Sequence, residues 1–111
     1  MELKELLKFI EIEDERLKKY YGSYTDQEKR ILARAVKLTE ELGELSEEVL
    51  FYNSFQRKQK SENHNEENLP EEFADIIITT LLLAKAMNVD IEKALEKKIN
   101  KINKRYEKIK P

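Results

Sequence analysis

Residues 70–89, PEEFADIIITTLLLAKAMNV, decide the fold of this chain, because they join an acidic start to a long run of apolar side chains. The proline suits the first turn of a helix, and the acidic residues after it favour the positive end of the helix dipole. One apolar stripe begins at Phe73, while Ile78 and Leu82 lie on the opposite side of the helix. We therefore expect a helix over residues 70–87 that is buried on both sides, at the centre of a bundle and at a subunit interface.

Three further helices are predicted from apolar residues that recur at helical spacing, and no strand pattern competes with them. They cover residues 2–20, 26–53 and 91–109. Thr25 and Glu28 have the spacing of a capping box at the start of the second helix, and Asp90 is an expected N-cap for the last. Gly43 lies inside the second helix, where we expect it to allow the close approach of a neighbouring helix.

The composition fits one small helical domain. The chain has 111 residues, 40% hydrophobic and 40% charged, with Gly 2 and Pro 2, so it is neither a disordered chain nor a membrane protein. We expect a single all-α domain over residues 1–111, with its core at roughly 26–109, in a four-helix bundle-like fold. Because so small a domain buries a modest core, we expect a homodimer or homotetramer that associates through the apolar third helix.

The net charge and the cysteine content indicate the cellular location and the kinds of partner to expect. The formal net charge is -2, and Cys is 0. A nearly neutral chain has no general attraction for nucleic acid, and the lack of cysteine fits a reducing cytoplasm. The longest apolar stretch, residues 76–86, is too short for a bilayer, which needs about 20 residues. We therefore expect a cytoplasmic protein that binds neither nucleic acid nor membrane.

Acidic residues on the second helix form the first half of a candidate site. The string TEELGEL spans residues 39–45. On a helical wheel Glu40 points to water, whereas four charged residues follow one flank of the apolar stripe. These four residues are Lys37, Glu41, Glu44 and Glu48. A pair of glutamates three residues apart is by itself usually a solvated face, so this half is not specific.

The second half lies in the third helix, where Glu72 and Asp75 are three residues apart and Asp75 stands among apolar neighbours. Carboxylates that face one another across two helices repel, and a divalent cation removes the conflict. The single histidine, His64, lies in a polar segment over residues 57–68, which we read as a loop. An all-oxygen site selects Mg²⁺, with Mn²⁺ as a substitute.

Two strings carry a resemblance to a known family. KLTEELGELSEEV and PEEFADIIITTLLLAKAMNVDIEKALEKKINKINKRY resemble the MazG-like members of the all-α NTP pyrophosphatase superfamily, over roughly residues 37–106. That family has EExxE on one helix, a variable loop, and ExxD on the next. The resemblance implies that the magnesium ligands are Glu41, Glu44, Glu72 and Asp75. It also implies that a K-x-N-x-R pattern on the last helix contacts substrate phosphates, through Lys101, Asn103 and Arg105. Lys37 is a further phosphate contact or a partner of the acids.

The resemblance implies hydrolysis of a nucleoside triphosphate between its α and β phosphates, which gives a monophosphate and pyrophosphate. It also implies a house-cleaning role, in which unwanted nucleotides are removed from the nucleotide pool. The general base is one of Glu41, Glu44 and Glu48. Alternatives are a phosphoribosyl-ATP pyrophosphohydrolase and a non-catalytic helical interaction or regulatory module. A di-iron bundle would need two Glu-x-x-His motifs, which this chain lacks. At the end of the second helix the aromatic residues are expected to pack rather than bind a base, namely Phe51, Tyr52 and Phe55.

Overall fold

The computed structural model describes residues 1–21, 25–52 and 68–107, and these residues form helices without a strand. The helices are α1 (Leu3–Tyr20), α2 (Gln27–Tyr52), α4 (Asn68–Ala86) and α5 (Ile91–Glu107). The predicted all-α class and the order of four helices are confirmed. The expected loop over residues 57–68 lies outside the described residues except for its last position, where α4 begins, and so do His64, Phe55 and the end of the expected fourth helix.

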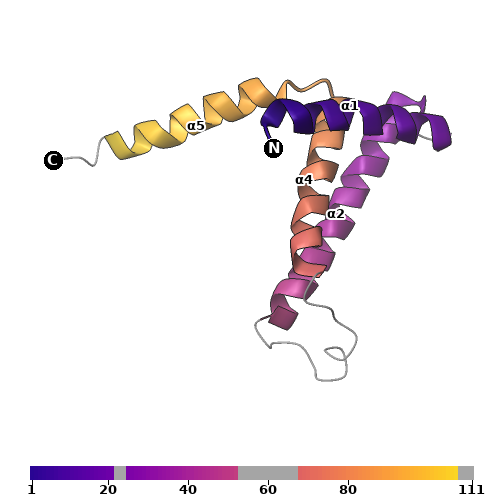
Figure 1. Cartoon of the computed structure of the whole chain (residues 1–111), viewed down its shortest axis with the longest axis horizontal. Coiled ribbons are helices and arrows are strands. Elements are labelled where there is room, and N and C mark those ends of the chain that lie inside the picture. The colour runs from indigo at the N-terminus through magenta and orange to yellow at the C-terminus, as the bar shows by residue number, and fades with distance from the viewer. Residues whose placement is uncertain (22–24, 53–67, 108–111) are drawn as a thin grey trace.

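The helices α2 and α4 lie side by side and antiparallel, and we call this pair the hairpin (Figure 1). At one end of the hairpin α1 crosses it and packs on α4. The last helix, α5, extends away from the other three (Figure 1). Packing within one chain therefore unites three helices, and the fourth completes no closed bundle with them in the described part of the chain.

The helix ends follow from local hydrogen bonds. The cap of α2 is Asp26, whose Oδ1 accepts a hydrogen bond from the backbone N–H of Lys29 at 3.1 Å, so the predicted capping box at Thr25 is wrong by one residue. The predicted cap of α5 is confirmed, since Asp90 Oδ1 accepts from the N–H of Lys93 at 3.1 Å. Between α4 and α5, Asn88 has a positive φ of 56°. Asparagine tolerates that conformation better than most residues, and it ends α4.

The core of one chain is small. It is formed by Ile10 of α1 with Leu81 and Leu82 of α4. Partly buried residues pack around this core, namely Leu6, Leu7, Leu17, Ile78 and Ile91. Within one chain only one side of α4 is covered, and Phe73 is 51% and Ile77 53% exposed. The expected burial of the other side at a subunit interface stays a prediction.

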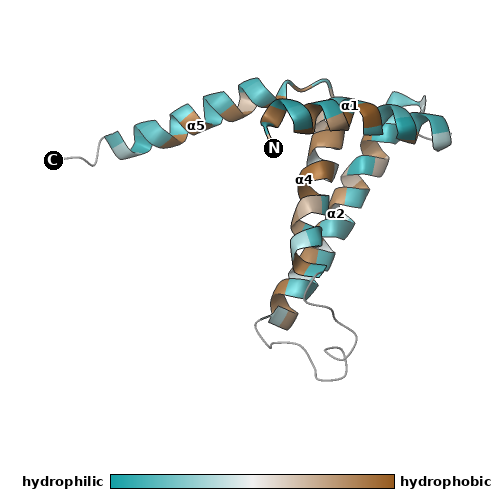
Figure 2. Ribbon diagram, in the orientation of Figure 1, coloured by the Kyte–Doolittle hydropathy of each residue, from teal (hydrophilic) through white to brown (hydrophobic). Residues whose placement is uncertain are grey.

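Apolar side chains are also left exposed on the other helices. Figure 2 shows hydrophobic residues concentrated along α4, whereas α5 is mostly hydrophilic with hydrophobic residues at intervals. On α2, Phe51 is partly buried, but Tyr52 is 75% exposed, so the expected packing fails for Tyr52 in one chain. A Cβ added at Gly43 would meet nothing within 4 Å, so this glycine marks no close helix approach among the helices that the structure describes. None of the described helices is long and apolar enough to cross a bilayer.

A buried ion pair fixes α1 on the hairpin. Arg34 Nη2 of α2 lies 2.8 Å from Asp14 Oδ1 of α1, and each side chain is 2% exposed. The same guanidinium donates from Nη1 to the carbonyl oxygen of Leu82 in α4 at 2.8 Å. One arginine thus joins three helices. On sequence alone both residues resemble ordinary surface charges, which is why this contact was not predicted.

Candidate metal centre

Three of the predicted acids converge where α2 faces the first turns of α4. Glu41, Glu72 and Asp75 each offer a carboxylate oxygen, and these three atoms lie within 4.8 Å of one another. Glu41 is buried, Glu72 is partly buried and Asp75 is exposed. The spacing of three residues puts Glu72 and Asp75 on one face of α4, and the antiparallel neighbour supplies Glu41. We call these three residues the acid cluster.

Two carboxylate oxygens in the acid cluster have no donor among the described residues. Glu41 Oε1 pairs with Lys37 Nζ at 3.2 Å. By contrast, Glu41 Oε2 and Glu72 Oε2 are buried without a hydrogen-bond partner among the described residues. Buried acceptors without donors are costly, and two ionised carboxylates cannot satisfy one another, so they must share a proton or bind a cation. The donor set is all oxygen, so these residues fit a hard divalent cation better than any group the chain itself provides.

The acid cluster raises its own pKa values. Burial, a hydrogen bond with Glu41 and the negative charges of Glu44, Glu41 and Asp75 raise the pKa of Glu72 to about 7. Burial and the charges of Glu41 and Glu71 raise the pKa of Asp75, although Lys37 opposes the shift. Near neutral pH the cluster therefore retains a proton in place of a cation, and cation binding would release it.

The remaining acids of α2 take different positions. Glu44 is exposed and is not one of the three converging residues, but its charge contributes to the raised pKa of Glu72. Glu48 is buried at 9% exposure. It stands two turns beyond Glu41, or about 10 Å along the helix. Glu40 is 59% exposed, so the prediction that it points to water is confirmed.

Of the predicted phosphate-binding residues, Lys37 lies at the acid cluster, whereas the three on α5 lie far from it. Lys37 contacts Glu41, so it is an acid partner in this structure. Hydrogen bonding to Glu41 raises the pKa of Lys37, which keeps it charged. Lys101, Asn103 and Arg105 are exposed on α5, which points away from the hairpin (Figure 1). One chain does not bring these three residues to the acid cluster.

A cavity of about 410 Å³ adjoins the acid cluster and was not predicted from the sequence. Glu41 and Asp75 line one side of it, and Glu13 and Leu17 of α1 line the other. The sequence could not reveal this cavity, because it depends on how α1 crosses the hairpin.

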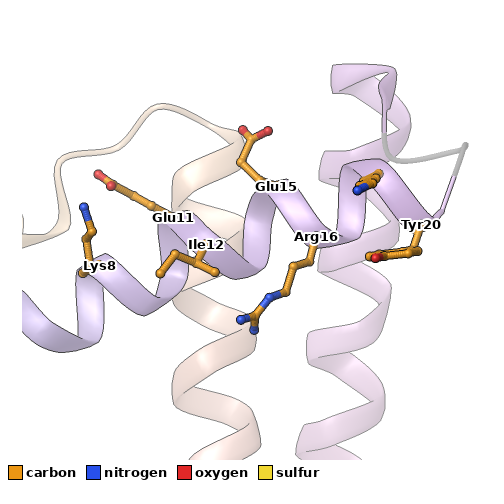
Figure 3. Close-up of a pocket in the computed structure, with 7 residues that line it drawn as sticks. Lys8, Glu11, Ile12, Glu15, Arg16 and Tyr20 are labelled. Carbon is orange, nitrogen blue, oxygen red and sulfur yellow. The ribbon is translucent and has the colours of Figure 1, made fainter.

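A second hollow lies on the outer face of α1 (Figure 3). Every residue that lines it belongs to α1, including Lys8, Glu15 and Tyr20. Within the part of the chain that the structure describes, no second element supplies an opposing wall there. We therefore assign no site to this hollow.

Comparison with known proteins agrees with the geometry. Residues 32–110 match the model of the MazG-like family. The chain is also 30% identical over 99 residues to the uncharacterized protein YpjD of Bacillus subtilis (strain 168), covering 89% of this chain and 85% of that protein. No solved structure matches it. The family match spans the acid cluster and most of the hairpin and begins beyond α1, so the chain belongs to the MazG-like family.

Proposed function

We propose that this protein is a magnesium-dependent nucleoside triphosphate pyrophosphohydrolase that acts on the nucleotide pool of the cytoplasm. Membership of the MazG-like family suggests nucleotide pyrophosphohydrolase chemistry. The observation that carries the finer proposal is the acid cluster, with two buried carboxylate oxygens that lack a donor. The products would be a nucleoside monophosphate and pyrophosphate.

The acid cluster would hold Mg²⁺ through Glu41, Glu72 and Asp75, with Glu44 joining from the exposed flank. When bound, the cation supplies positive charge for the phosphates and lowers the pKa of a bound water, and Mn²⁺ would substitute. Lys37 fixes the Glu41 carboxylate through its 3.2 Å contact, so one oxygen of Glu41 is held while the other faces the cluster. The protein thus orients the ligand oxygens before the substrate arrives.

A carboxylate of α2 would accept the proton of the attacking water. Glu44 suits this role because it is exposed beside the acid cluster and its charge reaches Glu72. Glu41 is a candidate if it is released from the cation. Glu48 is buried two turns away and would reach the water only if the substrate extends along α2.

Phosphate contacts by Lys101, Asn103 and Arg105 would have to come from a second copy of the chain. Within one chain α5 leaves the hairpin, yet it exposes an apolar stripe, with Leu95 at 43% and Ile99 at 54%. The basic polar face of α5 complements the acidic hairpin, and arginine suits bidentate phosphate contact. We therefore include a homodimer or homotetramer in the proposal.

The test is pyrophosphate release from a panel of canonical and modified NTPs and dNTPs, with Mg²⁺ and with EDTA. We expect magnesium-dependent release with monophosphate as co-product. Glu41→Ala and Asp75→Ala should abolish release and leave the helical circular dichroism unchanged, whereas Glu40→Ala, on the exposed face of the same helix, should retain it.

Other results would redirect the proposal. Normal turnover in Glu41→Ala or Asp75→Ala would show that the acid cluster is not the site. Release from phosphoribosyl-ATP alone would identify the related pyrophosphohydrolase. No release from any substrate, together with no thermal stabilisation by Mg²⁺, would leave a helical interaction module.

A further inference from the structure

We propose that the cavity between α1 and the hairpin holds the base and sugar of the nucleotide, and that Glu13 of α1 selects bases carrying an exocyclic amino group. This inference rests on the proposed function for its substrate class. It assigns a role to α1, a helix that lies outside the residues matched by the family model, which begin at residue 32. The selecting residue would thus lie on a different element from the acid cluster.

The cavity lies directly beside the acid cluster. Glu41 and Asp75 belong both to the acid cluster and to the cavity lining. A nucleotide whose phosphates lie at the acid cluster can therefore place its nucleoside in this cavity. The volume of about 410 Å³ is within the usual range for small-molecule sites, about 300–1,000 Å³.

The side chains that line the cavity suit a nucleoside. Leu17, Ile78 and Leu82 provide apolar surface for the faces of a ring, and Tyr21 provides an aromatic ring at the edge. Stacking of a base on an aromatic side chain stabilises binding without selecting among bases. Apolar walls with a few polar groups are typical of ligand sites, and here Thr79 supplies a buried hydroxyl among the polar groups.

Glu13 supplies the selectivity. Its side chain is 29% exposed and lines the cavity from α1, with Oε1 accepting a hydrogen bond from Arg16 Nη1 at 3.4 Å. An ionised carboxylate only accepts hydrogen bonds. It therefore favours the amino groups of cytosine and adenine, and it repels the carbonyl oxygens that replace them in uracil and hypoxanthine. A well-placed contact of this kind changes selectivity on the order of tenfold.

The experiment compares kcat/KM for two matched substrate pairs, CTP with UTP and ATP with ITP, in the presence of Mg²⁺. The members of each pair differ in an amino or carbonyl group at one ring position and in the hydrogen on the adjacent ring nitrogen. We expect the wild-type protein to favour the amino member, and Glu13→Gln to reduce that ratio about tenfold. The control is Glu15→Gln, because Glu15 is 76% exposed and lines the hollow on the outer face of α1. It should leave both ratios unchanged.

Hydrolysis of every substrate by Glu13→Gln with wild-type ratios would overturn the inference and leave the proposed function standing. If the wild-type protein hydrolyses neither these four nucleotides nor any member of the wider NTP and dNTP panel, the proposed function fails, and amide chemical shifts on adding CMP or UMP decide the inference. Larger shifts at Leu17 and Thr79 with CMP than with UMP, equalised by Glu13→Gln, would support it. Shifts elsewhere, or none, would overturn it.

Discussion

Replacing Arg34 should destabilise the protein far more than replacing Lys18, although both side chains contact the same carboxylate. Arg34 Nη2 lies 2.8 Å from Asp14 Oδ1, and Lys18 Nζ lies 3.0 Å from Asp14 Oδ2. The distances are nearly equal, but the Arg34 side chain is 2% exposed and that of Lys18 is 32% exposed. Burial rather than distance should therefore decide the cost of each substitution.

Arg34→Met keeps the side-chain bulk but removes one partner from a buried pair, which costs about 3–5 kcal/mol of unfolding free energy. Lys18→Met removes a partly exposed partner, which costs less than about 1 kcal/mol. In a chain of this size each kcal/mol lowers Tm by roughly 4 °C. We expect Tm to fall by roughly 12–20 °C for Arg34→Met and by less than about 4 °C for Lys18→Met.

The assay is thermal unfolding followed by circular dichroism, and the variants Asp14→Leu and Asp14→Leu/Arg34→Met complete a double-mutant cycle with Arg34→Met. Replacing both partners removes the uncompensated charge, so the double variant should be more stable than Arg34→Met alone. Equal losses for the two single variants would refute the argument from burial. A double variant no more stable than Arg34→Met would show that the uncompensated charge of Asp14 is not the cause of the loss, and would leave the hydrogen bond to the Leu82 carbonyl as its source.

Three further results are expected. In metal-free protein the unfolding free energy should fall by about 1–2 kcal/mol from pH 5 to pH 8, after allowance for solvent screening. The folded state retains a proton on Glu72, whose pKa is raised from 4.5 to about 7, and the unfolded state releases it. Saturating Mg²⁺ or Glu72→Gln should flatten this slope in thermal melts, and an unchanged slope would contradict it. Mixing inactive Arg105→Ala with inactive Glu41→Gln should restore pyrophosphate release if α5 acts on a second copy, whereas no recovery would place Arg105 elsewhere. Gly43→Ala should raise Tm by roughly 4 °C, since its Cβ meets nothing and alanine favours a helix by about 1 kcal/mol; a lower Tm would reveal a contact at Gly43 in the assembled protein.

The sequence predicted those parts of the molecule that depend on local spacing. Helix periodicity placed the four helices within two residues at each described end, and acids three residues apart marked the faces that carry Glu41, Glu72 and Asp75. Spacing along one helix predicts which side chains share a face. It does not predict which of them a neighbouring helix approaches, and Glu44, which shares a flank with Glu41, lies outside the three residues that converge.

Features that depend on the crossing of helices were not predicted. The ion pair of Asp14 and Arg34 joins helices whose relative position no local pattern fixes, and the same holds for the cavity that Glu13 lines. Likewise, an apolar surface all around α4 indicates that something covers it. It does not say whether the cover comes from the same chain, and in one chain Phe73 and Ile77 remain exposed.

The separation of α5 from the hairpin has a consequence for hydrogen exchange. An isolated helix of 17 residues is only marginally stable in water, because most helical stability in proteins comes from tertiary packing. In a lone chain the amide hydrogens of α5 would therefore exchange almost as fast as those of a free peptide, while those of α4 behind Leu81 and Leu82 would be protected. If copies of the chain associate through α5, as proposed, protection of the α5 amides would rise with protein concentration and would report the assembled fraction.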